Sequence, residues 1–87
     1  GLFYAVQIAS ASNKIKDPRE LGYSGTVNEL KTDNRYRYYT GKADSYAKVM
    51  QNLERIRKKI KDCFVIAVYN GKLIKIEEAK NLEKKLK

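Results

Sequence analysis

Side-chain size alternates along residues 3–9, and this alternation constrains the fold more than any other feature of the chain. The bulky, apolar set is Tyr4, Val6 and Ile8, and the small or polar set is Ala5, Gln7 and Ala9. A period of two is typical of a β-strand that buries one face. Because a glutamine in an apolar strand needs hydrogen-bond partners or water, the sequence predicts a first strand over residues 2–9 whose Gln7 side stays open.

Turn and cap residues divide the rest of the chain into short elements. Asp17 and Gly22 bracket one expected helical turn, and Asp44 is the expected N-cap of a long helix. The pair Asn70-Gly71 predicts a hairpin. The other expected elements are strands over residues 25–31, 35–40 (ended by Gly41), 63–69 and 72–74, the long helix over residues 45–61, and a terminal helix from Ile76.

The order of these elements predicts the fold class. It forms a βαββαβ plan with a shortened first helix, followed by a hairpin and a helix. We therefore expect an α+β fold of the ferredoxin-like or RNP-like type. Its antiparallel four-stranded sheet carries the helices on one face, and its first and third strands lie side by side. At 87 residues, the chain is expected to be a single domain, with a core over residues 3–74 and a helical tail over residues 75–87.

Side-chain bulk assigns each strand position to one face of the sheet. Tyr36, Tyr38 and Thr40 are expected to point toward the helices, because the opposite choice buries two unpaired guanidinium groups. In the strand over residues 63–69, the bulkier set is Phe64, Ile66 and Val68, which is expected to face the helices too. The open face is then expected to carry Ala5, Gln7, Ala9, Arg35, Arg37, Tyr39, Val65, Ala67 and Tyr69. Small residues beside glutamine, arginine and tyrosine predict a shallow groove suited to sugars or bases.

The residue types that are missing restrict the chemistry. The chain has no histidine and a single cysteine, Cys63, so it lacks a histidine-activated nucleophile and the ligands of an ordinary zinc site. It also lacks a glycine-rich phosphate loop and an apolar run long enough to span a membrane. We therefore expect no catalytic activity, no cofactor and no metal site within this chain.

The charge of the chain points to anionic partners. The formal net charge is +9, and the basic residues are densest over residues 55–61 and 80–87. Such an excess favours nucleic acid, acidic glycans or anionic lipid surfaces. The same lysines and arginines also suit the solvated faces of exposed helices, so the charge by itself leaves the partner open.

Three segments resemble signatures of the SPOR (sporulation-related repeat) family. Residues 3–10, FYAVQIAS, are similar to the opening signature of an aromatic residue, Val-Gln, an aliphatic residue and a small one. Residues 36–41, YRYYTG, resemble the second signature, an arginine-containing strand that runs into a glycine. Residues 45–67 resemble the third, a helix followed by an apolar strand. The ending over residues 69–79 is similar to SPOR-like tails of exported cell-wall proteins, including amidases.

The resemblance implies a module that binds septal peptidoglycan and prefers glycan strands free of stem peptides. By position, Gln7 hydrogen-bonds the sugars, Arg37 and Tyr39 line the groove, and Ser10 and Ser12 lie at its rim. Ala67 and Tyr69 join this site from the expected open face. The resemblance also implies a periplasmic or cell-envelope location, with a signal outside this segment, and a role in carrying a cell-wall or division protein to the septum.

Two other functions fit the same expected plan. RRM domains share the topology and bind single-stranded RNA through aromatic residues on the two central strands, but residues 35–39 lack the glycines of the RNP1 pattern. The RNA-binding alternative gains if Tyr36 and Tyr38 lie on the open face. The third alternative is a ferredoxin-like protein-interaction domain whose open face is covered by a partner.

Overall fold

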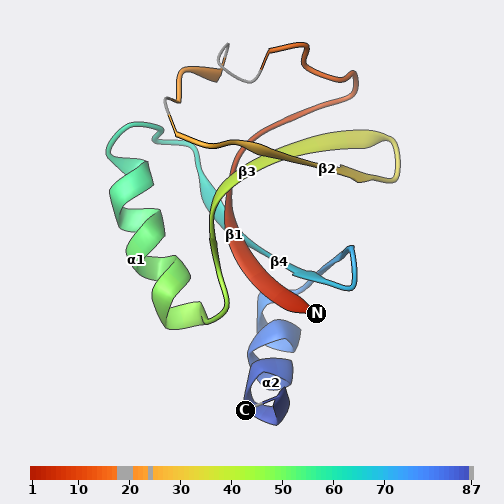
Figure 1. The fold of residues 1–87 in the computed structure, drawn as a ribbon, viewed down its shortest axis with the longest axis vertical. Coiled ribbons are helices and arrows are strands. Elements are labelled where there is room, and N and C mark those ends of the chain that lie inside the picture. The colour runs from red at the N-terminus through yellow and green to blue at the C-terminus, as the bar shows by residue number, and fades with distance from the viewer. Residues whose placement is uncertain (18–20, 24, 87) are drawn as a thin grey trace.

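The computed structural model describes residues 1–17, 21–23 and 25–86. They form an α+β fold with a curled, antiparallel sheet of five strands and two α-helices (Figure 1). The elements in chain order are β1 (Leu2–Ala11), β2 (Asn28–Thr32), β3 (Arg35–Ala43), α1 (Tyr46–Arg57), β4 (Phe64–Tyr69), β5 (Lys72–Ile74) and α2 (Ile76–Leu86). The expected helical turn over residues 17–22 includes residues 18–20, which lie outside the described part of the chain.

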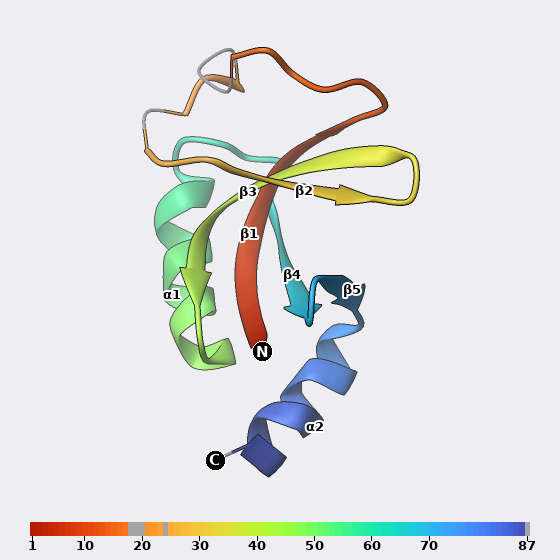
Figure 2. The ribbon, with the colours of Figure 1, turned by 45° about the vertical axis from the view of Figure 1, so that its right-hand side comes forward.

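The strand order is β2-β3-β1-β4-β5, so the first and third strands are neighbours, as expected. The ferredoxin-like details are not confirmed, because a fifth strand extends the sheet and no α-helix lies between β1 and β2 among the described residues. The antiparallel pairing of β1 with β3 agrees with the antiparallel sheet that was expected. The helical crossover lies between β3 and β4, where the plan expects its long helix. β3 and β4 both run antiparallel to β1, flank it, and are joined through α1 (Figure 2).

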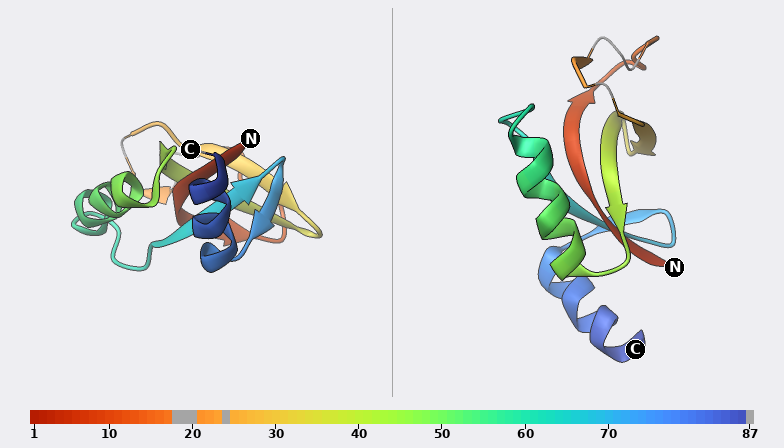
Figure 3. Two further views of the ribbon diagram at one scale, coloured as in Figure 1. Left: turned by 90° about the horizontal axis from the view of Figure 1, so that it is seen from below. Right: turned by 60° about the vertical axis from the view of Figure 1, so that its left-hand side comes forward.

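One face of the sheet packs against the helices, and β1 is buried on both sides. α1 lies along this face, and α2 packs below it, near the start of β1 (Figure 3). Tyr4 and Val6 point into this main core, as expected. α1 contributes the buried residues Val49, Leu53 and Ile56, and α2 contributes Ala79. The apolar side of α1 is therefore core, whereas Met50 of the same helix is exposed.

A smaller apolar cluster occupies the opposite face. Ala5, Ile66 and Val68 form its buried part, and Phe3, Leu30, Tyr39 and Leu73 pack against it. The prediction for β4 is therefore wrong, since Val65 and Ala67 pack on the helix side while Ile66 and Val68 lie on the other. β4 is apolar on both faces, so bulk alone does not fix which side meets the helices. The face expected to be open thus has an apolar centre of its own.

The boundaries of α1 differ from the prediction at both ends. Ser45, not Asp44, is the N-cap, and its hydroxyl oxygen accepts a hydrogen bond from the Lys48 backbone N–H at 3.2 Å. The helix ends at Arg57 instead of residue 61, because the backbone N–H groups of Lys59 and Ile60 both bond to the carbonyl of Ile56. That tightened last turn satisfies carbonyl-end groups that a longer helix would use internally.

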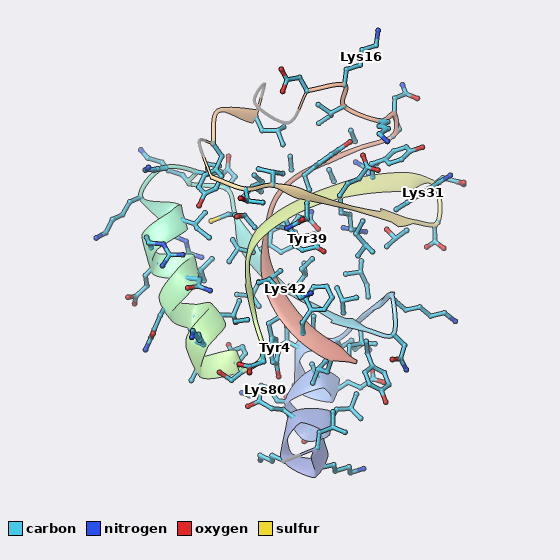
Figure 4. All side chains as sticks on the ribbon, in the orientation of Figure 1. Tyr4, Lys16, Lys31, Tyr39, Lys42 and Lys80 are labelled. Atoms are coloured by element: carbon cyan, nitrogen blue, oxygen red, sulfur yellow. The ribbon has the colours of Figure 1, made fainter. Side chains whose placement is uncertain are left out.

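Glu83 of α2 holds the start of α1. Its Oε1 accepts a hydrogen bond of 3.0 Å from the backbone N–H of Tyr46, the first residue of α1. A carboxylate at this end also opposes the positive end of the helix dipole. Lys80, one turn before Glu83, places its Nζ 4.6 Å from the centroid of the Tyr46 ring (Figure 4). The two helices are therefore joined by polar contacts as well as by the core.

Gly41 does not end β3 but bends it. The strand continues to Ala43, and its register with β1 shifts between the pairs Val6–Thr40 and Tyr4–Ala43. Gly41 has φ +64°, and a Cβ at this position would lie 2.8 Å from Ile56 Cδ1. Asn52 of α1 donates a hydrogen bond of 2.9 Å to the Gly41 carbonyl. The bulge therefore lets α1 approach the sheet closely.

Replacing Gly41 with alanine is expected to lower the free energy of unfolding by ~2–4 kcal/mol, from backbone strain and from the clash with Ile56. Gly71→Ala is the matched control, because Gly71 has φ +83° but open space around the added Cβ. Gly71→Ala should lower the free energy of unfolding by about 1 kcal/mol, because it adds only the backbone strain of a positive φ and no clash. Urea denaturation measures both, and the double variant Gly41→Ala, Ile56→Val should recover part of the loss. Equal costs for the two glycine variants would contradict the close packing of α1.

Tyr4 makes stability depend on pH in the alkaline range. Burial raises the pKa of its phenol above the usual value, and the nearby Glu83 raises it further, although the Tyr4 hydroxyl is not in hydrogen-bonding geometry. Above pH ~10, Tyr4 of the unfolded chain loses its proton while the folded chain keeps it, so stability falls as pH rises. Tyr4→Phe removes this loss. Relative to the wild type, its unfolding free energy should gain ~1 kcal/mol between about pH 9 and about pH 11. A difference that is constant with pH would contradict the prediction.

Candidate functional site

The candidate site lies on the sheet face that carries Gln7, which we call the Gln7 face. Gln7 of β1 lies opposite Tyr39 of β3 on one side and opposite Phe64 of β4 on the other. Directly opposed residues on neighbouring strands project to the same face. In the next residue pair of β1 and β3 on this face, Ser10 lies opposite Arg37. These five side chains therefore share the face that the helices do not cover.

The Gln7 face has a hydrogen-bonded polar centre. Gln7 is buried, with 4 % of its surface exposed. Arg37 donates from Nη1 to Gln7 Oε1 at 3.1 Å and from Nε to Thr32 Oγ1 at 2.9 Å. The guanidinium plane is thus fixed by acceptors on two different strands, β1 and β2. The prediction that the Gln7 side chain stays open to bind sugars is therefore wrong, because Gln7 is buried and its carbonyl oxygen is satisfied within the sheet.

A second arginine extends the polar row toward the end of β1. Arg35 donates from Nη2 to Ser10 Oγ at 3.1 Å, and this pair is exposed. Both arginines of β3 therefore reach across to β1, and both bond to neutral oxygens. In the described part of the chain, the one ion pair is Lys14–Glu29, which involves neither of them. Neither arginine is therefore ion-paired with a described acidic residue.

A hollow opens next to Arg37, between the two hairpin turns. Its volume is about 470 Å³, and it is lined by Lys31, Thr32, Asp33, Arg37, Gly71, Lys72 and Leu73. The first four come from the β2–β3 hairpin and the last three from the β4–β5 hairpin. The curl of the sheet brings the two hairpins toward the same side of the molecule (Figure 1). Leu73 also packs on the smaller apolar cluster, so the hollow adjoins it.

Aromatic side chains complete the Gln7 face. Phe64 exposes 48 % of its surface and lies beside Gln7. Phe3 and Tyr39 contact each other with ring centroids 5.7 Å apart. Lys42 places its Nζ 4.4 Å from the centroid of the Phe3 ring, and both Lys42 and Tyr39 belong to β3 (Figure 4). The face therefore combines exposed aromatic surface with cations, a pairing that suits ring-shaped anionic ligands.

The structure brings together only some of the residues predicted for the site. Gln7, Ser10, Arg37 and Tyr39 share the Gln7 face. Ser12 is exposed in the bend after β1 and lies beyond this row. Ala67 and Tyr69 lie on the opposite face, where Ala67 is fully buried in the main core and Tyr69 pairs with Leu2. Their exclusion follows from the reversed orientation of β4.

Two further corrections concern single positions. Ala9, which was expected beside Gln7, lies opposite Tyr38 because the register of β1 shifts between Gln7 and Ala9. Phe64, which was expected under the helices, is the exposed aromatic residue of the Gln7 face. Thr32, Leu73 and Lys72 were also not predicted. No sequence signal marks Leu73 and Lys72, but Thr32 adjoins the Asp33-Asn34 turn, which sets its register opposite Arg35.

Comparisons with known proteins add no assignment. The chain matches no protein-family model, curated protein or solved structure. Within the described residues, no group of three or more potential metal ligands occurs, and no helix is long and apolar enough to cross a membrane. The functional interpretation therefore depends on the geometry and charge of the Gln7 face.

The bond between Arg37 and Gln7 should be measurable as a coupling free energy. In a double-mutant cycle with Gln7→Ala and Arg37→Ala, urea denaturation should give a coupling of ~1 kcal/mol, because the guanidinium is partly screened by water. The matched control pairs Gln7→Ala with Arg35→Ala, since Arg35 bonds to Ser10 instead. Its coupling should be near zero. Equal coupling in both cycles would mean that the Arg37–Gln7 bond contributes nothing specific.

Proposed function

We propose that this chain is a non-catalytic module that binds peptidoglycan glycan strands, preferentially strands free of stem peptides, through the Gln7 face. The proposal includes the role of localising a cell-wall or division protein to the septum, in the periplasm or cell envelope. Its main support is Arg37, which Gln7 and Thr32 hold in place beside a basic hollow.

The chemistry of a glycan strand suits this face. Sugar rings pack their apolar sides on aromatic side chains, and the exposed ring of Phe64 offers such a surface next to Gln7. Sugar hydroxyl and N-acetyl groups need directional donors and acceptors, which the Arg35–Ser10 pair supplies at the exposed end of the row. Stripped strands still carry the lactyl carboxylates of muramic acid, which arginine and lysine attract.

The RNA-binding alternative receives less support. It requires Tyr36 and Tyr38 on the same face as Gln7. Tyr38 lies opposite Ala9 and is 1 % exposed, and its hydroxyl accepts a hydrogen bond from the Ile15 backbone N–H at 2.7 Å and donates one to Glu29 at 3.1 Å. Tyr36 precedes Arg37 in β3, so its side chain projects to the opposite face, where the Nζ of Lys31 lies 5.6 Å from the centroid of the Tyr36 ring. Neither ring is free to stack on bases from the Gln7 face.

The SPOR resemblance belongs to the same proposal. Strands β2-β3-β1-β4 lie in the order that a ferredoxin-like plan expects and β1 pairs antiparallel to β3, which supports the resemblance, whereas β5 departs from that plan. A larger protein that contains this domain, such as a cell-wall amidase, is a further part of the proposal. It comes from the resemblance of residues 69–79 alone.

Co-sedimentation with purified peptidoglycan sacculi tests the proposal. The domain should pellet with sacculi, and pelleting should increase after amidase treatment removes the stem peptides. Arg37→Ala and Phe64→Ala should each weaken binding by about tenfold, since each removes one charge-assisted contact or one stacking surface. Arg55→Ala is the matched control, because Arg55 is an exposed arginine of α1 and its loss changes the net charge equally.

Two results would contradict the proposal. One is equal or absent pelleting before and after amidase treatment. The other is an equal loss of binding in Arg37→Ala and Arg55→Ala, which would show a general charge effect and not a site. Circular dichroism of each variant verifies that the fold is retained.

A further inference from the structure

The hollow between the two hairpin turns has an excess of positive charge. Three of its lining residues are cationic, namely Lys31, Arg37 and Lys72, and one, Asp33, is acidic. Asp33 lies in the β2–β3 turn with φ +46° and forms no ion pair with Arg37. The remaining lining residues, Thr32, Gly71 and Leu73, are neutral. The field in the hollow therefore favours an anion.

Arg37 is a poorly compensated cation in a defined orientation. It is half-buried, and both of its bonded acceptors, Gln7 Oε1 and Thr32 Oγ1, are neutral. A guanidinium that loses hydration without gaining a carboxylate is costly. Arginine binds carboxylates through two parallel N–H donors, and its planar group is most effective when it is already held in place. The fixed guanidinium beside a basic hollow thus has the features of a carboxylate receptor.

The walls of the hollow leave room for such a group. Gly71 has no side chain, and an added Cβ there would meet nothing within 4 Å. Leu73 joins the hollow to the apolar cluster with Phe3 and Tyr39. A sugar ring that packs on this cluster would bring a substituent carboxylate toward Arg37 and Lys72.

We propose that this hollow is a carboxylate subsite, in which Arg37 assisted by Lys72 selects acidic over neutral glycans. The inference rests on the proposed function and adds its selectivity. The carboxylate can belong to the lactyl ether of a muramic acid or to a uronic acid, because the recognised group is the same. The subsite is separate from the sugar-stacking surface at Phe64, so affinity for the strand and preference for its charge should respond to different substitutions.

The experiment compares three fluorescently labelled glycans by anisotropy at fixed ionic strength. They are stem-peptide-free glycan chains, the same chains with their carboxylates converted to methylamides, and neutral N-acetylglucosamine oligomers. Wild-type protein should lose about tenfold in affinity when the carboxylates are amidated, and should bind the neutral oligomers as weakly as the amidated chains. An oligomer of uronic acid tests whether any glycan carboxylate suffices or whether the lactyl group is required.

Variants assign the preference to the hollow. Lys72→Gln should reduce the ratio between acidic and amidated chains about threefold, while Lys84→Gln on α2, the matched control, should leave it unchanged. Gln7→Glu should abolish the preference, because a carboxylate at position 7 would occupy Arg37 from within the sheet. Lys72→Arg keeps the charge and should keep the preference.

The outcomes separate this inference from the proposed function. Equal binding of acidic and amidated chains by the wild type overturns the carboxylate subsite while the glycan-binding role stands. A preference that Lys72→Gln and Gln7→Glu leave unchanged also overturns it, because the carboxylate is then recognised elsewhere. Absence of binding to all glycans overturns the proposed function together with the subsite.

Discussion

The burial of β1 on both faces is the constraint on which the rest of the structure depends. Four consecutive residues, Tyr4–Gln7, are buried. Tyr4 and Val6 point toward the helices, whereas Ala5 and Gln7 point to the other side. A strand in this position needs neighbours on both edges and cover on both faces. β3 and β4 supply the edges, the helices supply one cover, and the curled outer hairpins supply the other.

The curl has a direct chemical consequence for the Gln7 face. A flat sheet would leave Gln7 in water, where its amide would be hydrated and Arg37 would be mobile. The curl instead places Leu30 and Leu73 on the apolar cluster and leaves Gln7 with the guanidinium as its partner. The same movement brings the turns at Asp33 and Gly71 to opposite sides of one hollow. Buried polar pairs of this kind orient a functional group more than they stabilise a fold.

The sequence predicted the elements of the fold better than their curvature. The strand at β1, the Asn70-Gly71 hairpin and the start of α2 at Ile76 follow from local signals, and these elements were predicted correctly. The alternation in β1 also placed Tyr4 and Val6 correctly, but the side expected to be open is buried at Gln7. The orientation of β4 was wrong because an apolar strand carries no alternation to read. The bulges at Gly41 and near Ile8 were missed because a bulge reflects the fit between β1, β3 and α1, which no local pattern contains.

For the candidate site, Gln7, Arg37 and Tyr39 were found from composition and phase, whereas Phe64, Leu73 and Lys72 were not. Those three depend on how strands distant in sequence are paired.

The crossover through α1 also bears on how the chain reaches its folded state. β3 and β4 are joined by α1 but do not pair with each other, because β1 lies between them. The contiguous segment from β3 to β4 therefore leaves a vacant slot of one strand's width until the N-terminal strand enters it. Leu2 pairs with Tyr69 across nearly the whole chain, and such long-range pairing slows folding. A slot left unfilled by β1 would accept the equivalent strand of a second molecule, which is the route to strand exchange.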